Sequence, residues 1–348
     1  MEVFSEDSKC NRLMGNIWTP LNLEGHSVNL LDNYLVVAAT GISGEGWWYH
    51  SLEDARGGLL ANPWKHTKTL GKDAPMRHVS FVYGKDLILL GGTKGTQVAL
   101  QNGREENGEW NALRLTLKKN GVNFEQFPEF ACVVKVTKDI FYIMGGRVPP
   151  SGQATKKIYS INMKEQNVRE VGSLKYPRAQ HACAILPGPS KDFNNKQILV
   201  TGGSSHGDEI FDVTLRSSRI LTDSMKIPRI NHVLVTLDQK VFALGGKREA
   251  SDDSTLAEIE VFDADSESWS LQSSTLFSKS TEGLAVTELP SSSVSCIQDC
   301  QCGVKSGARI VGGTEAQVKL IEQESFGKSV LTGSLTFMAG SPSCFRGN

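Results

Sequence analysis

Short apolar runs, separated by polar and glycine-rich turns, recur along the first 290 residues of the chain. Five of them end in a glycine pair, or in Thr40–Gly41 in the first copy, and they recur about every 50 residues. An earlier apolar run precedes each of them. Short runs rich in β-branched and aromatic residues, without helical periodicity, predict β-strands. The five glycine-terminated runs are 33–41, 85–92, 138–146, 196–203 and 239–246.

Glycine pairs within a strand pattern indicate places where two backbones approach too closely for a side chain. One small sheet cannot bury both of its faces, so several such sheets are expected to stack radially. Aromatic residues on the outer strands are then expected to fill the wedge between neighbouring sheets. The glycines predicted to have this structural role are Gly41, Gly91, Gly92, Gly145, Gly146, Gly202, Gly203, Gly245 and Gly246.

An apolar strand, a double glycine, a separated aromatic residue and then a tryptophan follow one another in this pattern, which resembles the kelch repeat. In the fifth copy Trp269 follows Phe262, whereas Val168 stands near the tryptophan position of the third copy. The resemblance covers residues 1–290. It implies an all-β, kelch-type β-propeller of about six blades, each with four antiparallel strands.

Both ends of the repeat region are expected to contribute to one closing blade. The run "GLAVTEL" (283–289) is typical of a first strand, and "MEVFSEDSKCNRL" aligns with the outer strands "IEVFDADSESWSL" of the fifth copy. Closing the ring with strands from both termini would remove exposed sheet edges. For the second strand of this blade, only "SSSVSCIQ" (291–298) offers a poor match.

The stretch "CQCGVKSGARIVGGTEA" (300–316) resembles the activation junction of a trypsin-like serine protease. The resemblance implies a proteolytic site between Arg309 and Ile310. A triad needs a histidine, an aspartate and a serine after this point, but the last histidine of the chain is His232. We therefore expect no enzymatic activity, and residues 291–348 are predicted to be a linker and a truncated protease-like fragment, poorly ordered and dispensable for folding.

Four histidines, His26, His78, His181 and His232, each stand at the start of the first strand of a repeat. Repetition at equivalent positions predicts a structural role, because a catalytic site combines unlike residues. A copper radical oxidase built on related repeats is the enzymatic alternative. It would need tyrosine, histidine and cysteine ligands that converge, and the chain has six tyrosines without such a cluster. No metal or cofactor is therefore expected.

Three arginines stand in the turns that lead into the predicted innermost strands: Arg77 in "PMRH", Arg178 in "PRAQH" and Arg229 in "PRINH". The sequence predicts that they gather around one mouth of the central channel. In kelch domains of ubiquitin-ligase adaptors, arginines in similar turns help to capture acidic peptides, and guanidinium groups suit carboxylates. The alternative is that each arginine only fixes its own turn through backbone carbonyls.

A non-catalytic scaffold that binds a protein or peptide through loops at one mouth is therefore the predicted function. The alternative is a fragment of a secreted modular serine protease zymogen whose catalytic domain is missing, or a misjoined product. The net charge of −1 gives no reason to expect nucleic acid as a partner. No apolar run approaches the roughly 18 residues that span a membrane. The protein is expected to be a monomer.

The cysteines give two conflicting indications about the compartment. Cys132 and Cys183 lie in apolar strand-like runs and are predicted to be buried free thiols, as in a cytoplasmic protein. Cys296, Cys300, Cys302 and Cys344 cluster near the C-terminus, as in a secreted protein, and the spacing in "CIQDCQC" matches no common zinc pattern. The N-terminus has no signal-peptide pattern. The compartment is cytoplasmic on the first indication and secreted on the second.

Overall fold

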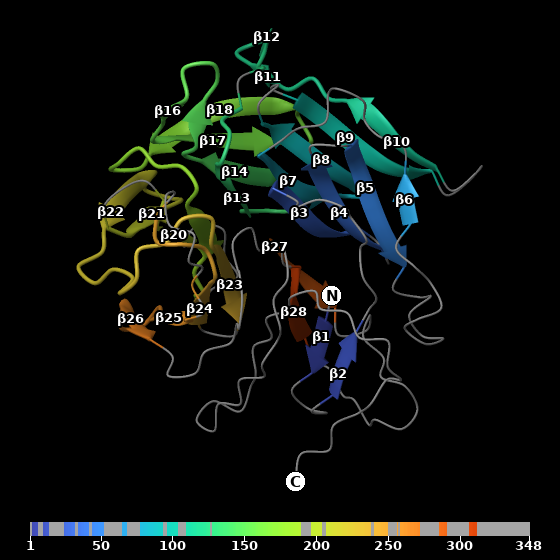
Figure 1. The fold of residues 1–348 in the computed structure, drawn as a ribbon. Helices are drawn as coiled ribbons and strands as arrows, with labels where there is room; N and C mark the ends of the chain where they lie inside the picture. The colour runs from blue at the N-terminus through green and yellow to red at the C-terminus, as the bar shows by residue number, and fades with distance from the viewer. Residues whose placement is uncertain are drawn as a thin grey trace.

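In the computed structural model, small antiparallel β-sheets are arranged around a common centre, as in a β-propeller (Figure 1). The described part of the chain contains strands and no helix, so it contains none long and apolar enough to cross a membrane. The prediction of an all-β, propeller-like fold is confirmed. The structure describes residues 2–5, 10–13, 24–31, 34–41, 44–51, 65–67, 77–92, 96–103, 109–125, 127–188, 196–203, 207–237, 240–249, 256, 258–271, 285–290 and 306–311.

Four sheets consist of four antiparallel strands, each paired with the next along the chain. Their short strands end at turns because Gly, Asn and Asp residues interrupt each apolar run. The first two sheets contain β3 (Glu24–Leu31), β4 (Tyr34–Gly41), β5 (Gly44–Ser51) and β6 (Lys65–Thr67), and β7 (His78–Tyr83), β8 (Asp86–Gly91), β9 (Thr96–Gly103) and β10 (Glu109–Arg114). The other two contain β19 (Ala182–Ile185), β20 (Gln197–Thr201), β21 (Glu209–Asp212) and β22 (Ser217–Ile220), and β23 (Val233–Leu237), β24 (Lys240–Leu244), β25 (Glu260–Asp263) and β26 (Ser268–Leu271).

A larger sheet lies between these two pairs along the chain. Four of its strands follow the order of the other sheets: β13 (Cys132–Lys135) at one edge, then β14 (Ile140–Met144), β17 (Lys157–Asn162) and β18 (Asn167–Ser173). A hairpin of β11 (Lys118–Lys119) and β12 (Val122–Asn123) extends it beyond β18, to which β11 runs parallel. A second hairpin, β15 (Arg147–Val148) and β16 (Gln153–Ala154), forms a separate two-stranded sheet after β14.

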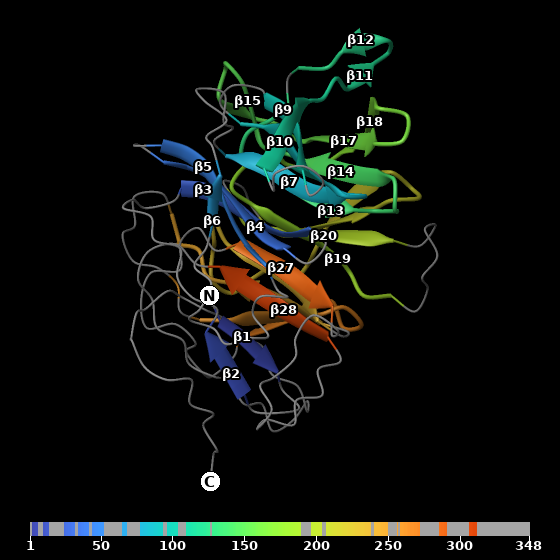
Figure 2. The ribbon, with the colours of Figure 1, turned by 90° about the vertical axis from the view of Figure 1, so that its right-hand side faces the viewer.

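Two further strand pairs come from the ends of the described chain. β27 (Ala285–Pro290) pairs with β28 (Ser306–Val311), and β1 (Glu2–Ser5) pairs with β2 (Cys10–Leu13). β28 lies beside β1, as Figures 1 and 2 show. The predicted second strand of the closing blade, 291–298, lies outside the described residues. The strand that pairs with β27 is Ser306–Val311, so this pairing crosses the predicted domain boundary at residue 290.

The five glycine-terminated runs form the second strands β4, β8, β14, β20 and β24, as predicted. Each pairs with the strand that precedes it along the chain, and these first strands contact one another in order: β3 with β7, β7 with β13, β13 with β19, and β19 with β23. β27 in turn contacts both β23 and β3. The first strands therefore lie innermost, and the later strands of each sheet lie toward the rim.

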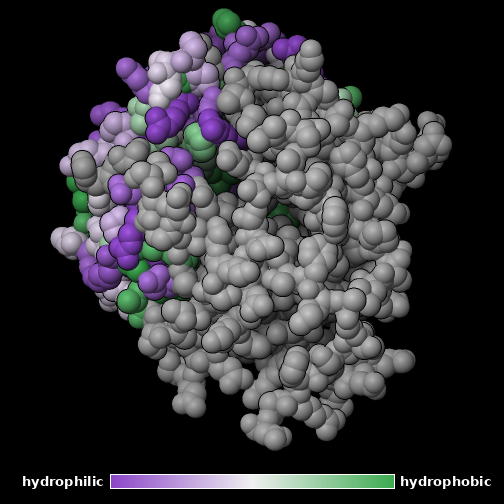
Figure 3. Space-filling model, viewed as in Figure 1, coloured by the Kyte–Doolittle hydropathy of each residue, from purple (hydrophilic) through white to green (hydrophobic). Residues whose placement is uncertain are grey.

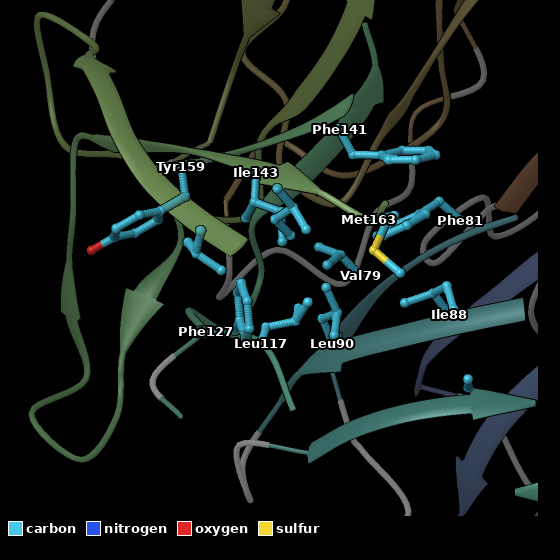
Figure 4. Close-up of a cluster of buried hydrophobic side chains, with 13 residues drawn as sticks. Val79, Phe81, Ile88, Leu90, Leu117, Phe127, Phe141, Ile143, Tyr159 and Met163 are labelled. Carbon is cyan, nitrogen blue, oxygen red and sulfur yellow. The ribbon is translucent and has the colours of Figure 1, made fainter. Parts of the chain in front are cut away.

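The hydrophobic core consists of clusters between neighbouring sheets. Val79, Leu90 and their neighbours on β7 and β8 face Ile143 and Tyr159 of the next sheet (Figure 4). The rings of Phe81 and Phe141 stack there with their centroids 4.0 Å apart. Phe211 of β21 and Phe262 of β25 occupy similar positions in the two following clusters. Phe211 and Phe262 fill the wedge between neighbouring sheets, as predicted for the aromatic residues of the outer strands.

The prediction of free thiols at Cys132 and Cys183 is wrong. The two residues form a disulfide between β13 and β19, the first strands of neighbouring sheets, with their Cα atoms 5.9 Å apart. Their separation of 51 residues is about one repeat, so the fold brings them to adjacent strands. Of the other cysteines, Cys296, Cys300, Cys302 and Cys344 lie outside the described residues.

Candidate functional site

Arg178 lies inside the fold and not at its surface. Its side chain is 0% exposed. Its guanidinium donates to the carbonyl oxygens of Gly202 and Gly207, both at 3.0 Å, and to the Glu209 carboxylate at 2.8 Å. Glu209 is also fully buried and accepts hydrogen bonds from the backbone N–H groups of Lys175 and Tyr176. Arg178 therefore links the turn before β19 to the third strand of the same sheet.

Arg229 repeats this arrangement in the next sheet. Nε donates to the Glu260 carboxylate at 3.1 Å, and the two Nη atoms donate to the carbonyl oxygens of Gly245 (2.9 Å) and Glu258 (2.8 Å). Both charged side chains are fully buried. Burial lowers the pKa of Arg229, and the Glu260 carboxylate acts in the opposite direction.

These contacts correct the predicted binding role of Arg178 and Arg229. A fully buried guanidinium that bonds a carboxylate and two carbonyls has no surface to offer a partner. The alternative, that each arginine fixes its own turn, describes both residues. Each arginine binds the carbonyl oxygen of the first glycine of a predicted pair, Gly202 for Arg178 and Gly245 for Arg229. The arginine, the glutamate and the glycine pair thus form one structural unit in each of these two sheets.

Arg77 is not equivalent to the other two arginines. It directly precedes His78, whereas Arg178 and Arg229 stand three residues before His181 and His232. Its backbone is left-handed, with φ of 60°. The residues that match it in this respect are Phe130 (φ 52°), Gln180 (φ 59°) and Asn231 (φ 54°), one just before the first strand of each following sheet.

These four residues, which we call the inner-rim arc, are joined by backbone hydrogen bonds. The N–H of Phe130 donates to the carbonyl of Arg77 (3.2 Å), that of Gln180 to Phe130 (3.1 Å), and that of Asn231 to Gln180 (2.9 Å). The chain of bonds links four neighbouring sheets at the end where their innermost strands begin. A left-handed conformation costs a residue with a side chain about 1–3 kcal/mol. Four neighbouring sheets each have such a residue at the same place. The surrounding fold therefore strongly determines the backbone conformation there.

The side chains of the arc are half-buried and chemically mixed. The Arg77 guanidinium lies over the Phe130 ring, 4.6 Å from its centroid, and 3.9 Å from the Glu129 carboxylate. Gln180 and Asn231 add amide groups, which both donate and accept hydrogen bonds. The arc therefore combines a cation, an aromatic ring and two amides along one edge.

Two basic residues stand next to the arc at equivalent positions. Arg147 and Lys247 each directly follow a glycine pair, and their backbones bridge to Glu129 and Ile230, the residues that precede Phe130 and Asn231. Both side chains are half-buried, and the neighbouring Arg248 is exposed. The edge along the arc thus has four basic residues and two acidic ones, Glu129 and Glu249.

The glycine pairs allow close contact with the following sheet, as predicted. A Cβ atom on Gly145 would lie 2.7 Å from the Arg178 carbonyl oxygen and 2.7 Å from Cε1 of His181. On Gly202 it would lie 2.4 Å from the Arg229 carbonyl oxygen and 2.7 Å from Cε1 of His232. His181 and His232 are buried against these glycines, which agrees with the structural role predicted for them. His78 instead contacts the Ser27 hydroxyl at 3.0 Å, and the His26 side chain lies outside the described residues.

No protein-family model matches the chain, and no curated protein matches it either. Within the described residues, no group of three or more His, Cys, Asp and Glu side chains is placed to hold a metal ion. The candidate site therefore rests on the geometry of the arc.

The buried histidines predict how stability depends on pH. Burial, helped by the Arg178 charge, lowers the pKa of His181 from 6.5 to about 3, and burial also lowers that of His232. Below pH 6.5 the unfolded chain therefore binds protons that the folded chain does not, and stability falls as the pH falls toward 3. Burial raises the pKa of Asp208 from 3.8 to about 6, so this group acts in the opposite direction between pH 6 and 3.8.

We expect the His181→Gln variant to lose less stability on acidification than the wild type does. Between pH 7 and pH 5 the difference between the two declines should be about 2 kcal/mol. Urea unfolding of both proteins at the two pH values measures it, because a general effect of the substitution cancels in the comparison. Equal declines would show that His181 does not remain neutral in the folded protein.

Proposed function

We propose that the chain is a non-catalytic, monomeric interaction scaffold of the kelch type, which binds an extended, acidic segment of a protein partner along the inner-rim arc. The observation that carries the proposal is the hydrogen-bonded row of four strained, half-buried residues, Arg77, Phe130, Gln180 and Asn231, at one end of the innermost strands. Strained residues held in place by the surrounding fold are often found at binding sites. The proposal involves neither nucleic acid nor a membrane.

The repeated contacts of the glycine pairs support a kelch type. In successive sheets the first glycine packs against the histidine of the following sheet, and an aromatic residue of the third strand fills the wedge. Phe262 and Trp269, seven positions apart, pack with ring centroids 5.2 Å apart, and Val168 is buried at the corresponding place in the third copy. Each feature of the kelch-like pattern thus has a packing contact that accounts for it.

The register of β28 supports a sixth blade. Val311 of β28 lies opposite Ala285, the first residue of β27. Leu244 lies opposite Val233, the first residue of β23, in the same way. Both Val311 and Leu244 are followed directly by two glycines, Gly312–Gly313 and Gly245–Gly246. The "IVGG" sequence is therefore interpreted as a sixth copy of the glycine-terminated strand.

This interpretation gives the protease-like stretch a role within the repeat. Arg309 and Ile310 pair with Thr287 and Val286 inside an antiparallel ladder, as the second strands of the other sheets do. The segments β27, β28, β1 and β2 would then form the closing blade, because β28 lies beside β1 and β27 beside both β3 and β23. A ring of six blades closed by both termini follows from this arrangement, and no protease has to be assumed.

The chemistry of the edge supports an acidic, extended partner. Arg77 together with Arg147 and Lys247 favours carboxylates. The amides of Gln180 and Asn231 suit the backbone of an extended peptide, and the Phe130 ring suits an apolar side chain. On the face seen in Figure 3, the described surface is mainly hydrophilic, with apolar residues in small, separate spots. A partner is therefore expected to be recognised through polar groups.

Selection of a random-peptide display library on the purified chain tests the proposed function. We expect the selected peptides to be rich in Asp and Glu and to lose affinity by about five-fold, or about 1 kcal/mol, on the Arg77→Ala variant. Their binding should also weaken with added salt, because the contacts include exposed charges.

Arg219→Ala is the matched control, because Arg219 lies on β22 and pairs with Glu267 at the exposed rim. This variant should bind the selected peptides as the wild type does. Peptides without acidic residues, or equal binding to both variants and the wild type, would contradict the proposed site.

A further inference from the structure

The disulfide between Cys132 and Cys183 joins two neighbouring sheets, whose other contacts among the described residues are packing and hydrogen bonds. Both cysteines are half-buried residues that pack against the apolar cluster between the two sheets. Reduction of a disulfide needs the approach of a thiolate to one of its sulfur atoms, which full burial would prevent. Neither of the two cysteines is fully buried.

Between two other pairs of first strands, polar side chains form hydrogen bonds. Between β3 and β7, Asn29 donates to the Ser80 hydroxyl at 2.9 Å. Between β19 and β23, the Thr236 hydroxyl donates to the carbonyl oxygen of Ile185 at 3.0 Å. Between β13 and β19 the disulfide is the corresponding link, and it is the one covalent link between sheets within the described residues. A reversible covalent bond therefore stands between β13 and β19 where the other two pairs have a polar contact.

The disulfide lies close to one joint of the inner-rim arc. Phe130 stands two residues before Cys132, and Gln180 stands three residues before Cys183. The N–H of Gln180 donates to the carbonyl oxygen of Phe130 at 3.1 Å, across the same two sheets that the disulfide joins. By keeping β13 and β19 together, the disulfide therefore also maintains the hydrogen bond between Gln180 and Phe130.

We propose that Cys132 and Cys183 form a redox-controlled clasp that sets the spacing of Phe130 and Gln180. A dithiol reductant transfers two electrons and two protons to the clasp: its S–S bond breaks, two thiols form, and the reductant becomes a disulfide. In the oxidised protein the joint between β13 and β19 stays closed. In the reduced protein it opens more often, and the arc loses its continuous edge. Partner binding along the arc should then weaken, and only this consequence rests on the proposed function.

Hydrogen exchange on the oxidised full chain, with and without dithiothreitol, tests the clasp. Non-reducing peptide mapping should first show the Cys132 peptide linked to the Cys183 peptide. Reduction should then speed exchange of the Gln180 amide by about ten-fold or more. The Asn231 amide, which bonds Gln180 across the next pair of sheets, should change much less. The thermal unfolding midpoint should fall by roughly 5 °C.

The Cys132→Ser/Cys183→Ser variant controls for the remaining cysteines. It should show the fast Gln180 exchange with and without reductant, and its midpoint should not respond to dithiothreitol. If this variant does not fold, the wild-type comparison alone decides. Absence of the linked peptide, or unchanged Gln180 exchange on reduction, would overturn the clasp. None of these readouts needs a partner, so they fail or succeed independently of the proposed binding site.

Discussion

The Arg229→Ala variant is expected to be less stable than the wild type by about 3–5 kcal/mol. The substitution leaves the Glu260 carboxylate fully buried without its cation, and it removes the donors to the carbonyls of Gly245 and Glu258. An uncompensated buried charge is among the most destabilising changes that a single substitution can make. Urea unfolding at neutral pH measures the loss.

Two controls separate the buried ion pair from a general effect of losing an arginine. Arg219→Ala removes an exposed arginine that also pairs with a glutamate, and it should change stability by less than about 1 kcal/mol. The double variant Arg229→Met/Glu260→Leu should recover part of the lost stability, because it removes the unpaired buried charge but still leaves the carbonyls of Gly245 and Glu258 without their donor. A loss below about 1 kcal/mol for Arg229→Ala would contradict its role as a buried link.

Proline within β28 is expected to destabilise the protein by about 2–4 kcal/mol. Successive N–H groups of a strand point to opposite sides, so either Arg309→Pro or Ile310→Pro must remove an N–H that bonds β27. The more harmful of the two should lower the unfolding midpoint clearly. Thermal unfolding followed by circular dichroism measures both variants.

Val294→Pro is the matched control for these variants. Val294 lies in the stretch 291–298, which the sequence alone suggests as the second strand of the closing blade. If Ser306–Val311 is that strand, proline at Val294 should have little effect. A larger loss for Val294→Pro than for both β28 variants would restore the assignment made from the sequence, together with the boundary at residue 290.

The repeated strands were predictable because their cause is local. The first glycine of a pair leaves no room for a Cβ atom beside the next sheet, and the second leaves none beside the turn that precedes its own sheet. The first glycines are Gly91, Gly145 and Gly202, and the second are Gly146, Gly203 and Gly246. Phe211 and Phe262 likewise recur because each fills the wedge between its sheet and a neighbouring sheet. Repetition therefore revealed both the sheets and the residues between them.

The roles of the arginines were harder to predict because their partners are distant in the sequence. Glu209 and Glu260 each follow their arginine by 31 residues, and the sequence pattern alone does not link them. Arg77 was grouped with Arg178 and Arg229 by residue type. Arg77, Gln180 and Asn231 each stand directly before the histidine of their repeat. This shared position is the signal in the sequence that identifies the arc.

The disulfide and β28 were missed for a different reason. Cys132 and Cys183 lie one repeat apart in apolar runs, where a buried thiol is the more common state. In β28, the residues that resemble a protease junction are also an apolar run followed by two glycines, as in the other copies of the repeat. In both cases the position within the repeat was more informative than the local sequence.

Ring closure by Ser306–Val311 is tested most directly by amide hydrogen exchange on the intact chain. We expect the slowest amides of Ala308, Arg309 and Ile310 to exchange at least about a hundred-fold more slowly than in an unstructured chain. The slowest amides of Val241–Leu244 in β24, the corresponding strand of the preceding sheet, should be slow in the same sample. Exchange of 306–311 at the rate of an unstructured chain, while β24 stays protected, would contradict a closing blade built on this strand.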